Sequence, residues 1–501
     1  MIPASLTLIA GLVVAPSLIF QASFLQQPLG ALVCVLALAS IVPLVRRAQW
    51  GRPDLSLAMV ALAAAVALTL FAGVGHVFFQ TDDWTTREAV LLDLERNSWP
   101  VAYATERGEA LLRAPLGMYL VPAAFGRMFG SVAGDAALFA QNAGLFALCL
   151  YAFASSFDSA RARWIAIPFF VVFSGLDSIA WAKRLVDGVP SNLVLPHLDP
   201  WPGALQFSSH VTQFFWAPNH ALAGWALVVF YLAWRAGRIP ALLMGPVWAA
   251  SIFWSPLAAL GAIPFLVFAF VWDVKDGKLR LADFAASFAA GAAALPVLVY
   301  FTRDGAAVEK GFLNFADMEV LRSYFAMLML KVAPWLAVAW QAVDRRDKRS
   351  VSEFWLIVAA LVVIPTYKMG FANDFAMRVS IPALALLCLR VVPALAALGA
   401  EPVSRRAIVA GFVLMGAITP GVEIMRNVTQ KSYAASACTL VDALIEPPEQ
   451  ALYLASSSSF ATPPGLFRPP QGAPVTHTIA DCWPGRSFVY AGSYRPPTQL
   501  R

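Results

Sequence analysis

The chain has 501 residues, of which 59% are hydrophobic and 13% are charged. Soluble domains carry about 45–50% apolar and about 25% charged residues, so the composition excludes an ordinary soluble globular protein. The net charge of +6 does not indicate nucleic-acid binding, because the Lys and Arg residues are dispersed through turns between apolar stretches, where the positive-inside rule places them.

Apolar stretches dominate the chain, and about thirteen of them approach the roughly 20 residues that a membrane-spanning helix needs. The predicted spans lie near residues 3–21, 28–45, 55–79, 134–156, 164–176, 218–235, 240–255, 257–272, 282–301, 322–342, 352–367, 379–398 and 407–424. The first stretch has no basic segment before it, and another apolar stretch follows at once. We therefore interpret it as a membrane helix rather than a cleaved signal peptide.

Six turns between these stretches carry several Lys or Arg residues and are predicted to be cytoplasmic. They contain Arg46, Arg47 and Arg52; Arg161 and Arg163; Arg235 and Arg238; Lys275, Lys278 and Arg280; the segment 344–349; and Arg405 with Arg406. The turns alternate correctly with the spans only if the stretch Pro115–Gly130 does not cross the bilayer. This stretch is short and contains Pro122 and Arg127, so we predict an interfacial or re-entrant helix. The N-terminus is then cytoplasmic and the C-terminus extracytoplasmic.

The polar segments then gather on the outer side of the predicted membrane. They are the loops 80–133, 177–217 and 303–321, the turn 367–378 and the tail from residue 426. We predict an all-α polytopic membrane domain over residues 1–425. A small, loop-rich extracytoplasmic domain should follow over residues 426–501, with strands near 451–456 and 487–492. The tail holds Cys438 and Cys482, which an oxidising compartment allows to pair, although the sequence alone does not fix the pairing.

Two adjacent carboxylates, Asp82 and Asp83, open the first outer loop directly after a predicted span. Neighbouring side chains on a helix point in different directions, so the two cannot face one point without a turn in the backbone. Acidic residues are also typical of the first turn of a helix, where they cap free N–H groups. The alternative is that one of them is a general base, or binds a metal ion or a sugar.

Further candidates stand where the second outer loop meets the membrane. Asp177 follows Ser174 and Gly175 at the outer end of one span. Asn219 and His220 begin the next span. They are better candidates for a site than the tryptophans of the same loop, which are typical membrane anchors.

The last outer turn brings together Lys368, Asn373, Asp374 and Arg378. Asp374 and Arg378 are four residues apart, so one interpretation is a simple pair on one helix face. Alternatively, Arg378 clamps a phosphate, which its planar guanidinium fits better than a Lys does, and Lys368 adds positive charge. Lys331 lies within a predicted span, where a charge is costly unless it is paired or functional, and its role stays open.

This layout resembles the C-type (GT-C) glycosyltransferase superfamily of integral-membrane enzymes. In many members a long first outer loop begins with an acidic residue and ends in a Pro-rich, Tyr-containing helix that does not cross the bilayer. Here the matching stretch is Arg113–Gly130, which contains Tyr119, and Asp177 falls where the family carries its second acidic motif. The chain departs from the family because Asp82 and Asp83 are adjacent rather than spaced, and because two extra spans precede the expected first helix.

The resemblance implies a GT-C-like bundle and inverting transfer of a hexosyl or pentosyl group from a polyprenyl-phosphate carrier to a glycan, lipid or protein acceptor. The reaction would take place on the extracytoplasmic side of a bacterial cytoplasmic membrane, with membrane lipids as partners. Asp82 or Asp83 would deprotonate the acceptor, and Asp177 would orient the acceptor or a metal ion. The residues expected to hold the substrate and its phosphate are Arg378, Asp374, Asn373, Lys368, His220 and Asn219. No cofactor is identified, and participation of a divalent metal ion is left open.

Three other functions remain open. A transporter or lipid-linked flippase typically shows inverted repeats and helices broken near the bilayer midplane, and we find neither pattern in the sequence. A polymerase or ligase of lipid-linked glycans would use the same membrane face and carrier. A non-enzymatic assembly partner would have its outer carboxylates scattered rather than converging with Arg378.

Overall fold

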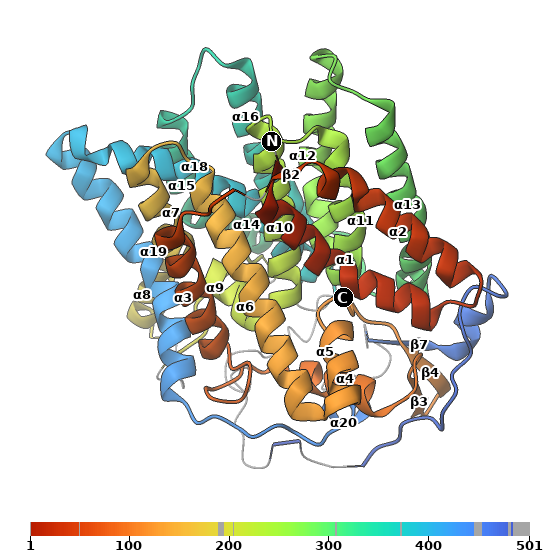
Figure 1. Ribbon diagram of the computed structural model, residues 1–501. Coiled ribbons are helices and arrows are strands. Elements are labelled where there is room, and N and C mark those ends of the chain that lie inside the picture. Colours follow the sequence, from red (N-terminus) through yellow and green to blue (C-terminus); the bar gives the residue numbers. More distant parts are fainter. Residues whose placement is uncertain are drawn as a thin grey trace.

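The computed structural model describes residues 2–49, 51–188, 195–203, 205–305, 308–370, 373–444, 453–478 and 482–483. Within these residues, ten helical segments are long and apolar enough to cross a membrane (Figure 1). They are Ala4–Phe24 (α1), Leu29–Arg46 (α2), Ser131–Ser155 (α6), Ala160–Val172 with Asp177–Val186 (α7 and α8), Pro256–Lys275 (α12), Leu281–Thr302 (α13), Met318–Lys331 with Ala333–Gln341 (α14 and α15), Lys348–Val363 (α16), Ile381–Ala397 (α18) and Val403–Thr429 (α19). The chain is therefore a polytopic helical membrane protein.

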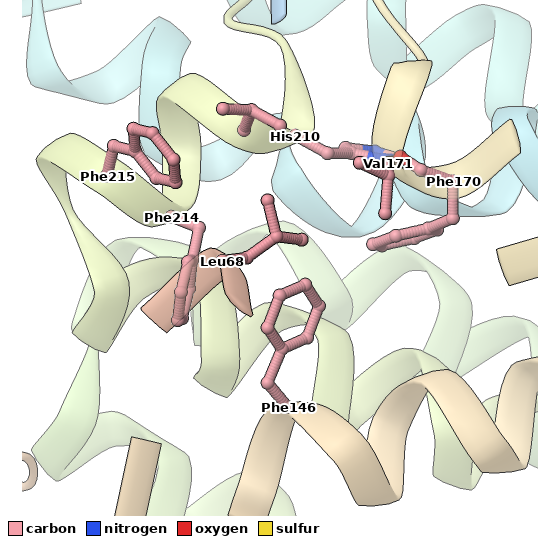
Figure 2. Close-up of a pocket in the computed structure, with 8 residues that line it drawn as sticks. Leu68, Phe146, Phe170, Val171, His210, Phe214 and Phe215 are labelled. Carbon is pink, nitrogen blue, oxygen red and sulfur yellow. The ribbon is translucent and has the colours of Figure 1, made fainter. Parts of the chain in front are cut away.

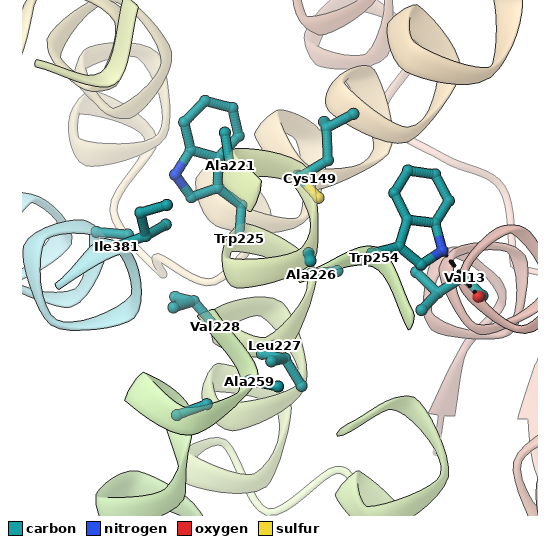
Figure 3. Close-up of a cluster of buried hydrophobic side chains, with 14 of the residues drawn as sticks. Val13, Cys149, Ala221, Trp225, Ala226, Leu227, Val228, Trp254, Ala259 and Ile381 are labelled. Atoms are coloured by element: carbon teal, nitrogen blue, oxygen red, sulfur yellow. Dashed lines mark hydrogen bonds between the residues drawn. The ribbon is translucent and has the colours of Figure 1, made fainter. Parts of the chain in front are cut away.

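The remaining predicted spans correspond to Leu55–Phe71 (α3), Pro218–Arg235 (α10) and Gly245–Trp254 (α11). Of these, α10 is central: 16 of its 18 residues are buried, and it packs on α6, α12 and α18. A helix that is apolar on all sides and fully buried contacts protein rather than lipid. Figure 3 shows part of this core, in which the Trp254 indole donates to the Val13 carbonyl at 3.0 Å. The total of thirteen spans stays a prediction.

The basic turns lie together at one end of the bundle. Ion pairs link four of them: Arg235–Asp347 at 2.7 Å, Arg349–Asp276 at 2.7 Å and Arg47–Asp283 at 3.0 Å. The Arg161 guanidinium lies beside Gly399, which adjoins the Arg405–Arg406 turn. This gathering is what alternation of the turns with the spans predicts. We call this end of the bundle the basic end, and the opposite end the loop end.

The stretch Pro115–Gly130 contains a helix of 10 residues, Leu120–Phe129 (α5). At 1.5 Å per residue it is about 15 Å long, half of what a hydrocarbon core of roughly 30 Å requires. Met128 and Phe129 on this helix are 63% and 69% exposed. The helix is therefore too short to cross the bilayer by itself, and its interfacial placement stays a prediction.

Short elements of the first outer loop and the tail meet at the loop end. Helix α4 (Asp83–Arg96) contacts α5 and α20 (Leu440–Ala443). The strands Ala102–Thr105 (β3), Gly108–Leu112 (β4) and Leu454–Ser456 (β7) form one antiparallel sheet in the order β3-β4-β7, with Leu111 opposite Ala455. The predicted tail strand near 451–456 thus exists as β7 and pairs with the first loop, whereas the one near 487–492 lies outside the described residues.

The other short elements complete the chain. They are the paired strands Ile2–Pro3 (β1) and Ala48–Gln49 (β2), the paired strands Lys310–Phe312 (β5) and Tyr367–Met369 (β6), the helices His210–Trp216 (α9) and Asp374–Val379 (α17), and the 3-10 turns Ala241–Met244 (η1), Ile364–Thr366 (η3), Leu398–Ala400 (η4) and Ser457–Ala461 (η5).

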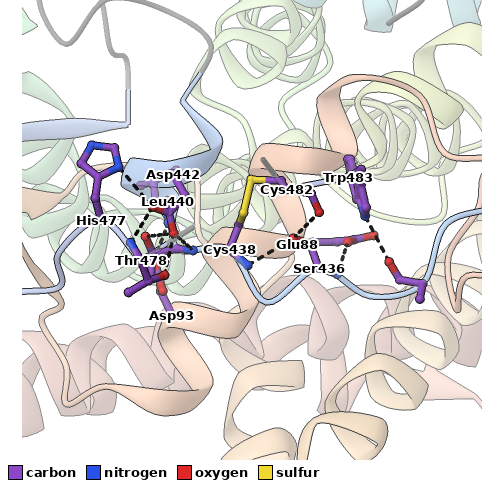
Figure 4. The surroundings of a disulfide bond; sticks show 12 residues. Glu88, Asp93, Ser436, Cys438, Leu440, Asp442, His477, Thr478, Cys482 and Trp483 are labelled. Carbon is purple, nitrogen blue, oxygen red and sulfur yellow. Dashed lines mark hydrogen bonds and ion pairs between the residues drawn. A yellow bond between two sulfur atoms is a disulfide. The ribbon is translucent and has the colours of Figure 1, made fainter. Parts of the chain in front are cut away.

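The carboxylates of Glu88 and Asp93 on α4 bind the tail, and a disulfide joins two parts of the tail to each other (Figure 4). Cys438 and Cys482 form the disulfide, which the sequence left undecided. Asp93 of α4 accepts from the Leu440 N–H at 2.8 Å and from the Tyr103 hydroxyl at 3.0 Å. Burial raises the pKa of the Asp93 carboxyl to about 6, although these two hydrogen bonds oppose the shift. A disulfide is typical of an oxidising compartment, which suits an extracytoplasmic tail.

Candidate functional site

Arg87 is the centre of a polar group at the loop end. It lies one helical turn after Asp83 on α4, and 3% of it is exposed. Its Nε and Nη2 both donate to the Trp216 carbonyl, at 3.1 and 2.7 Å, and its Nη1 donates to Asn219 Oδ1 at 3.0 Å. The Tyr119 hydroxyl is 3.4 Å from Nη1, and Asp83 Oδ2 is 3.3 Å from Nη2. A buried guanidinium held from four sides is a fixed positive charge.

The junction between α9 and α10 leaves free the carbonyls to which side chains of α4 donate. Helix α9 ends at Trp216 and α10 begins at Pro218, so the last carbonyls of α9 have no partner within a helix. The Trp84 indole donates to the Phe215 carbonyl at 2.9 Å, and Arg87 donates to the Trp216 carbonyl. The sequence around Pro218 therefore dictates where α4 docks.

Asn219 and His220, both predicted as site residues, stand in the first turn of α10 and are buried. The Asn219 amide donates from Nδ2 to the Trp254 carbonyl at 3.0 Å, so it connects Arg87 to the end of α11. His220 Nδ1 lies 2.6 Å from the Ser255 hydroxyl in the junction between α11 and α12. Both side chains are fixed by their neighbours.

Arg378 and Asp374 lie on α17 and pair at 2.9 Å. Asn373 precedes them in a left-handed conformation with φ of 55°, and its side chain caps the helix by accepting from the Ala376 N–H at 3.3 Å. Helix α17 approaches α12 closely at Gly261, where a Cβ atom would collide with the Val379 carbonyl. The lack of a side chain at residue 261 thus sets the position of Arg378.

These carboxylates and guanidinium groups act on one another. Burial raises the pKa of the Asp374 carboxyl, the nearby Arg378 opposes this, and the charge of Asp83 adds to the rise. The exposed fractions of the side chains are 14% for Asp374, 22% for Arg378 and 40% for Asp83. The structure therefore brings together a solvent-facing carboxylate and two guanidinium groups, those of Arg87 and Arg378.

The tail supplies a further member of this group. Tyr453 precedes β7, and its carbonyl accepts from the Arg113 N–H at 2.7 Å. Burial raises the pKa of the Tyr453 phenol to about 12. Tyr119 and Asp83 add to this rise, whereas Arg87 and Arg378 oppose it. We call Asp83, Arg87, Tyr119, Asn219, His220, Asp374, Arg378 and Tyr453 the loop-end site.

Two of the predicted site residues, Asp82 and Lys368, do not belong to the loop-end site. Asp82 is only 4% exposed, so of the two adjacent acids Asp83 is the one that faces solvent. Lys368 lies on β6 and pairs with Glu309 at 3.3 Å across the β5–β6 sheet. Its proposed partnership with Arg378 has no contact to support it in the part of the chain that the structure describes.

Asp177 makes no contact with the loop-end site in the part of the chain that the structure describes, and its predicted place at the bilayer surface stays a prediction. It is fully buried and ion-paired with Lys331, which also binds Asp199 at 2.7 Å. The Trp201 indole donates to Asp177 at 2.7 Å, and the Thr419 hydroxyl donates to Asp177 at 3.2 Å. We call Asp177, Asp199 and Lys331 the buried triad.

The triad lies inside the bundle because Asp177 begins α8 within the candidate span Ala160–Val186, and because the described part of the segment after α8 packs inward as α9. Helix α15 has 9 residues, so Lys331 is about 15 Å from the basic end at 1.5 Å per residue. All seven residues of α9 are buried. Gly175 permits the approach, because a Cβ there would collide with the Lys331 side chain. The sequence could not show that a loop of this length turns inward.

Two hollows elsewhere in the described chain are lined mainly by apolar side chains. The one in Figure 2 is lined by Leu68, Phe146, Phe170, Val171, His210, Val211, Phe214 and Phe215. Its polar member, His210, already engages the Phe170 carbonyl at 2.9 Å. Neither this hollow nor the second one, between α1, α2, α11 and α13, contains a charged side chain. The chemistry therefore points to the loop-end site rather than to these hollows.

Comparisons do not identify the chain: no family model, curated protein or solved structure matches it. The resemblance to GT-C enzymes accordingly stays a prediction. Among the described residues, no cluster of three or more His, Cys, Asp or Glu side chains is arranged to hold a metal ion. Sequence reasoning missed Arg87, Tyr119 and Tyr453. Spacing from Asp83 signals Arg87, whereas nothing near Tyr453 in the sequence signals its role.

Proposed function

We propose that the chain is an integral-membrane glycosyltransferase. It moves a hexosyl or pentosyl group from a polyprenyl-phosphate carrier to an acceptor at the outer face of a bacterial cytoplasmic membrane. The N-terminus and the basic end would be cytoplasmic. The observation that carries the proposal is the convergence of the accessible Asp83 carboxylate with Arg87 and Arg378 at the end opposite the basic turns.

The charges of the loop-end site suit this reaction. Arg378 is partly exposed and can present its guanidinium to two phosphate oxygens. The acceptor oxygen would attack the anomeric carbon while the bond from that carbon to the phosphate oxygen breaks. The acceptor proton passes to Asp83, and the carrier leaves as polyprenyl phosphate, whose charge Arg378 and Arg87 stabilise.

The neighbouring residues receive supporting roles. Asn219 and Tyr119 hold the Arg87 guanidinium in place. Asn373 caps the helix that carries Arg378. Asp177 contacts no reacting group in this proposal and instead anchors the inward loop through Lys331.

The test is transfer by the purified chain in vesicles that contain radiolabelled polyprenyl-phosphate hexose or pentose. Product formation by the wild type, with at least a hundredfold loss in Asp83→Asn on the scale typical of a general base, supports the proposal. Asp187→Asn is the matched control, because Asp187 also stands on an outer segment but pairs with the exposed Lys183. Equal transfer by wild type and Asp83→Asn would contradict the assignment.

One observation favours a transporter as the second candidate. Helices α7 and α8 break between Phe173 and Leu176, α14 and α15 break at Val332, and the Leu176 N–H bonds to the Leu330 carbonyl at 2.9 Å where the breaks meet. Broken helices around a buried ionic group are typical of transporters, and the sequence did not reveal them. Substrate uptake into vesicles that Lys331→Met abolishes, without any transfer activity, would favour this function.

A further inference from the structure

We propose that Glu423 is a positioning residue that holds Arg87 in place through Trp216. The inference rests on the proposed function, because it explains how a cation of the loop-end site is fixed. Glu423 lies on α19, more than 300 residues from Arg87 in the sequence, and is fully buried. In the part of the chain that the structure describes, it makes no direct contact with Arg87, so its influence passes through the residue between them.

Trp216 is that residue. Its carbonyl accepts two hydrogen bonds from Arg87, at 3.1 and 2.7 Å. Its indole Nε1 donates to Glu423 Oε2 at 3.0 Å. One end of Trp216 therefore fixes the guanidinium while the other end is fixed by the carboxylate.

Glu423 holds the surroundings of the indole as well. Its Oε1 lies 2.7 Å from His197 Nδ1, and its Oε2 also pairs with Arg426. The His197 ring stacks on the Trp216 ring with centroids 4.7 Å apart, and the Arg426 guanidinium lies 5.7 Å from the same ring. His197, Trp216 and Arg426 are at most 6% exposed. A single carboxylate thus orders the Trp216 indole and the two side chains that pack on it.

The interruption between α9 and α10 at Ala217 explains why the Trp216 indole needs the hydrogen bond to Glu423. Because α9 stops at Trp216, the carbonyl that Arg87 uses has no helix to fix its direction. The indole anchor replaces that restraint. Glu423→Gln removes the charge that pairs with Arg426 and leaves a single oxygen to accept from both the indole and Arg426, so Trp216 is held less firmly.

Binding of polyprenyl phosphate in lipid nanodiscs, compared with uncharged polyprenol, tests the inference. We expect Glu423→Gln and Arg87→Lys each to weaken phosphate-lipid binding by about tenfold or more, as the loss of a charge-assisted hydrogen bond predicts. Binding of the alcohol should not change. The double variant should be no weaker than Arg87→Lys alone, because both changes act through one contact. Additive losses, or full binding by Glu423→Gln, would overturn the inference.

The control for burial is Glu353→Gln. Glu353 is equally buried and ion-paired, with Arg235 at 3.3 Å, but it stands at the basic end. It should lower stability without changing phosphate-lipid binding. Hydrogen exchange supplies a readout that needs no ligand: α4 should exchange faster in Glu423→Gln than in Glu353→Gln. If wild type fails to distinguish phosphate from alcohol, the proposed function is wrong, and unchanged exchange in α4 would separately refute the role of Glu423.

Discussion

Replacing Lys331 with Met should destabilise the chain strongly, because it removes the cation of the buried triad. The stem of Met follows that of Lys, so packing against Gly175 is kept and the charge is the main loss. Lys331 is 1% exposed and both of its partners are 0% exposed. Two carboxylates would then share a buried space without a counter-charge.

The size of the effect follows from this burial. Removing one partner of a buried ion pair costs about 3–5 kcal/mol, whereas breaking an exposed pair costs about 0.3–0.5 kcal/mol. Lys183 provides the exposed comparison, since it pairs with Asp187 at 2.5 Å and is 73% exposed. We therefore expect Lys331→Met to lower the free energy of unfolding by about 3–5 kcal/mol, and Lys183→Met to lower it by less than about 1 kcal/mol.

Denaturant titration of the purified chain in mixed micelles measures both variants at one pH. Adding Asp177→Asn and Asp199→Asn to Lys331→Met should recover much of the loss, because no buried charge then remains. Equal unfolding midpoints for Lys331→Met and Lys183→Met would refute the reasoning. So would a further loss on adding the two Asn residues, since uncompensated charge could not then be the cause.

Three further predictions concern other parts of the chain. Burial, with a contribution from Asp135, raises the pKa of the Glu95 carboxyl to about 7 from 4.5. The stability from its protonated form is complete below about pH 4.5 and is lost as the pH rises through about 7. Glu95→Gln should therefore gain stability over wild type in thermal melts above pH 7, and an unchanged pH profile would contradict this. Gly261→Ala should displace α17 and weaken binding of polyprenyl phosphate, whereas Gly291→Ala, with open space at its Cβ position, should leave binding unchanged. Cys438→Ser should speed proteolysis of the tail while the spans stay intact, as gel analysis after brief protease treatment would show.

Much of the architecture could be predicted from the sequence because it depends on local patterns. Apolar length predicts the helices, and the clustering of Arg and Lys predicts which turns share one end. Two prolines and a short apolar run predict that Pro115–Gly130 does not cross. The pairing of Asp83 with an arginine one turn later is also compatible with spacing alone.

The centre of the site could not be predicted in the same way. The contacts of Arg87 with Trp216 and Asn219 join residues about 130 positions apart. Asp177 and Lys331 are residue types expected in a functional site. Whether they pair with each other depends on how the segments that carry them pack inside the bundle. A one-dimensional pattern contains charge and spacing, whereas depth and pairing arise from packing.

The shared sheet of β3, β4 and β7 has a consequence for biosynthesis. Strand β4, near residue 110, pairs with β7, near residue 455, and Tyr453 directly precedes β7. A nascent chain that has inserted nearly all its helices would still lack β7 and Tyr453 at its loop end. Docking of this final segment is then the step that completes the loop-end site.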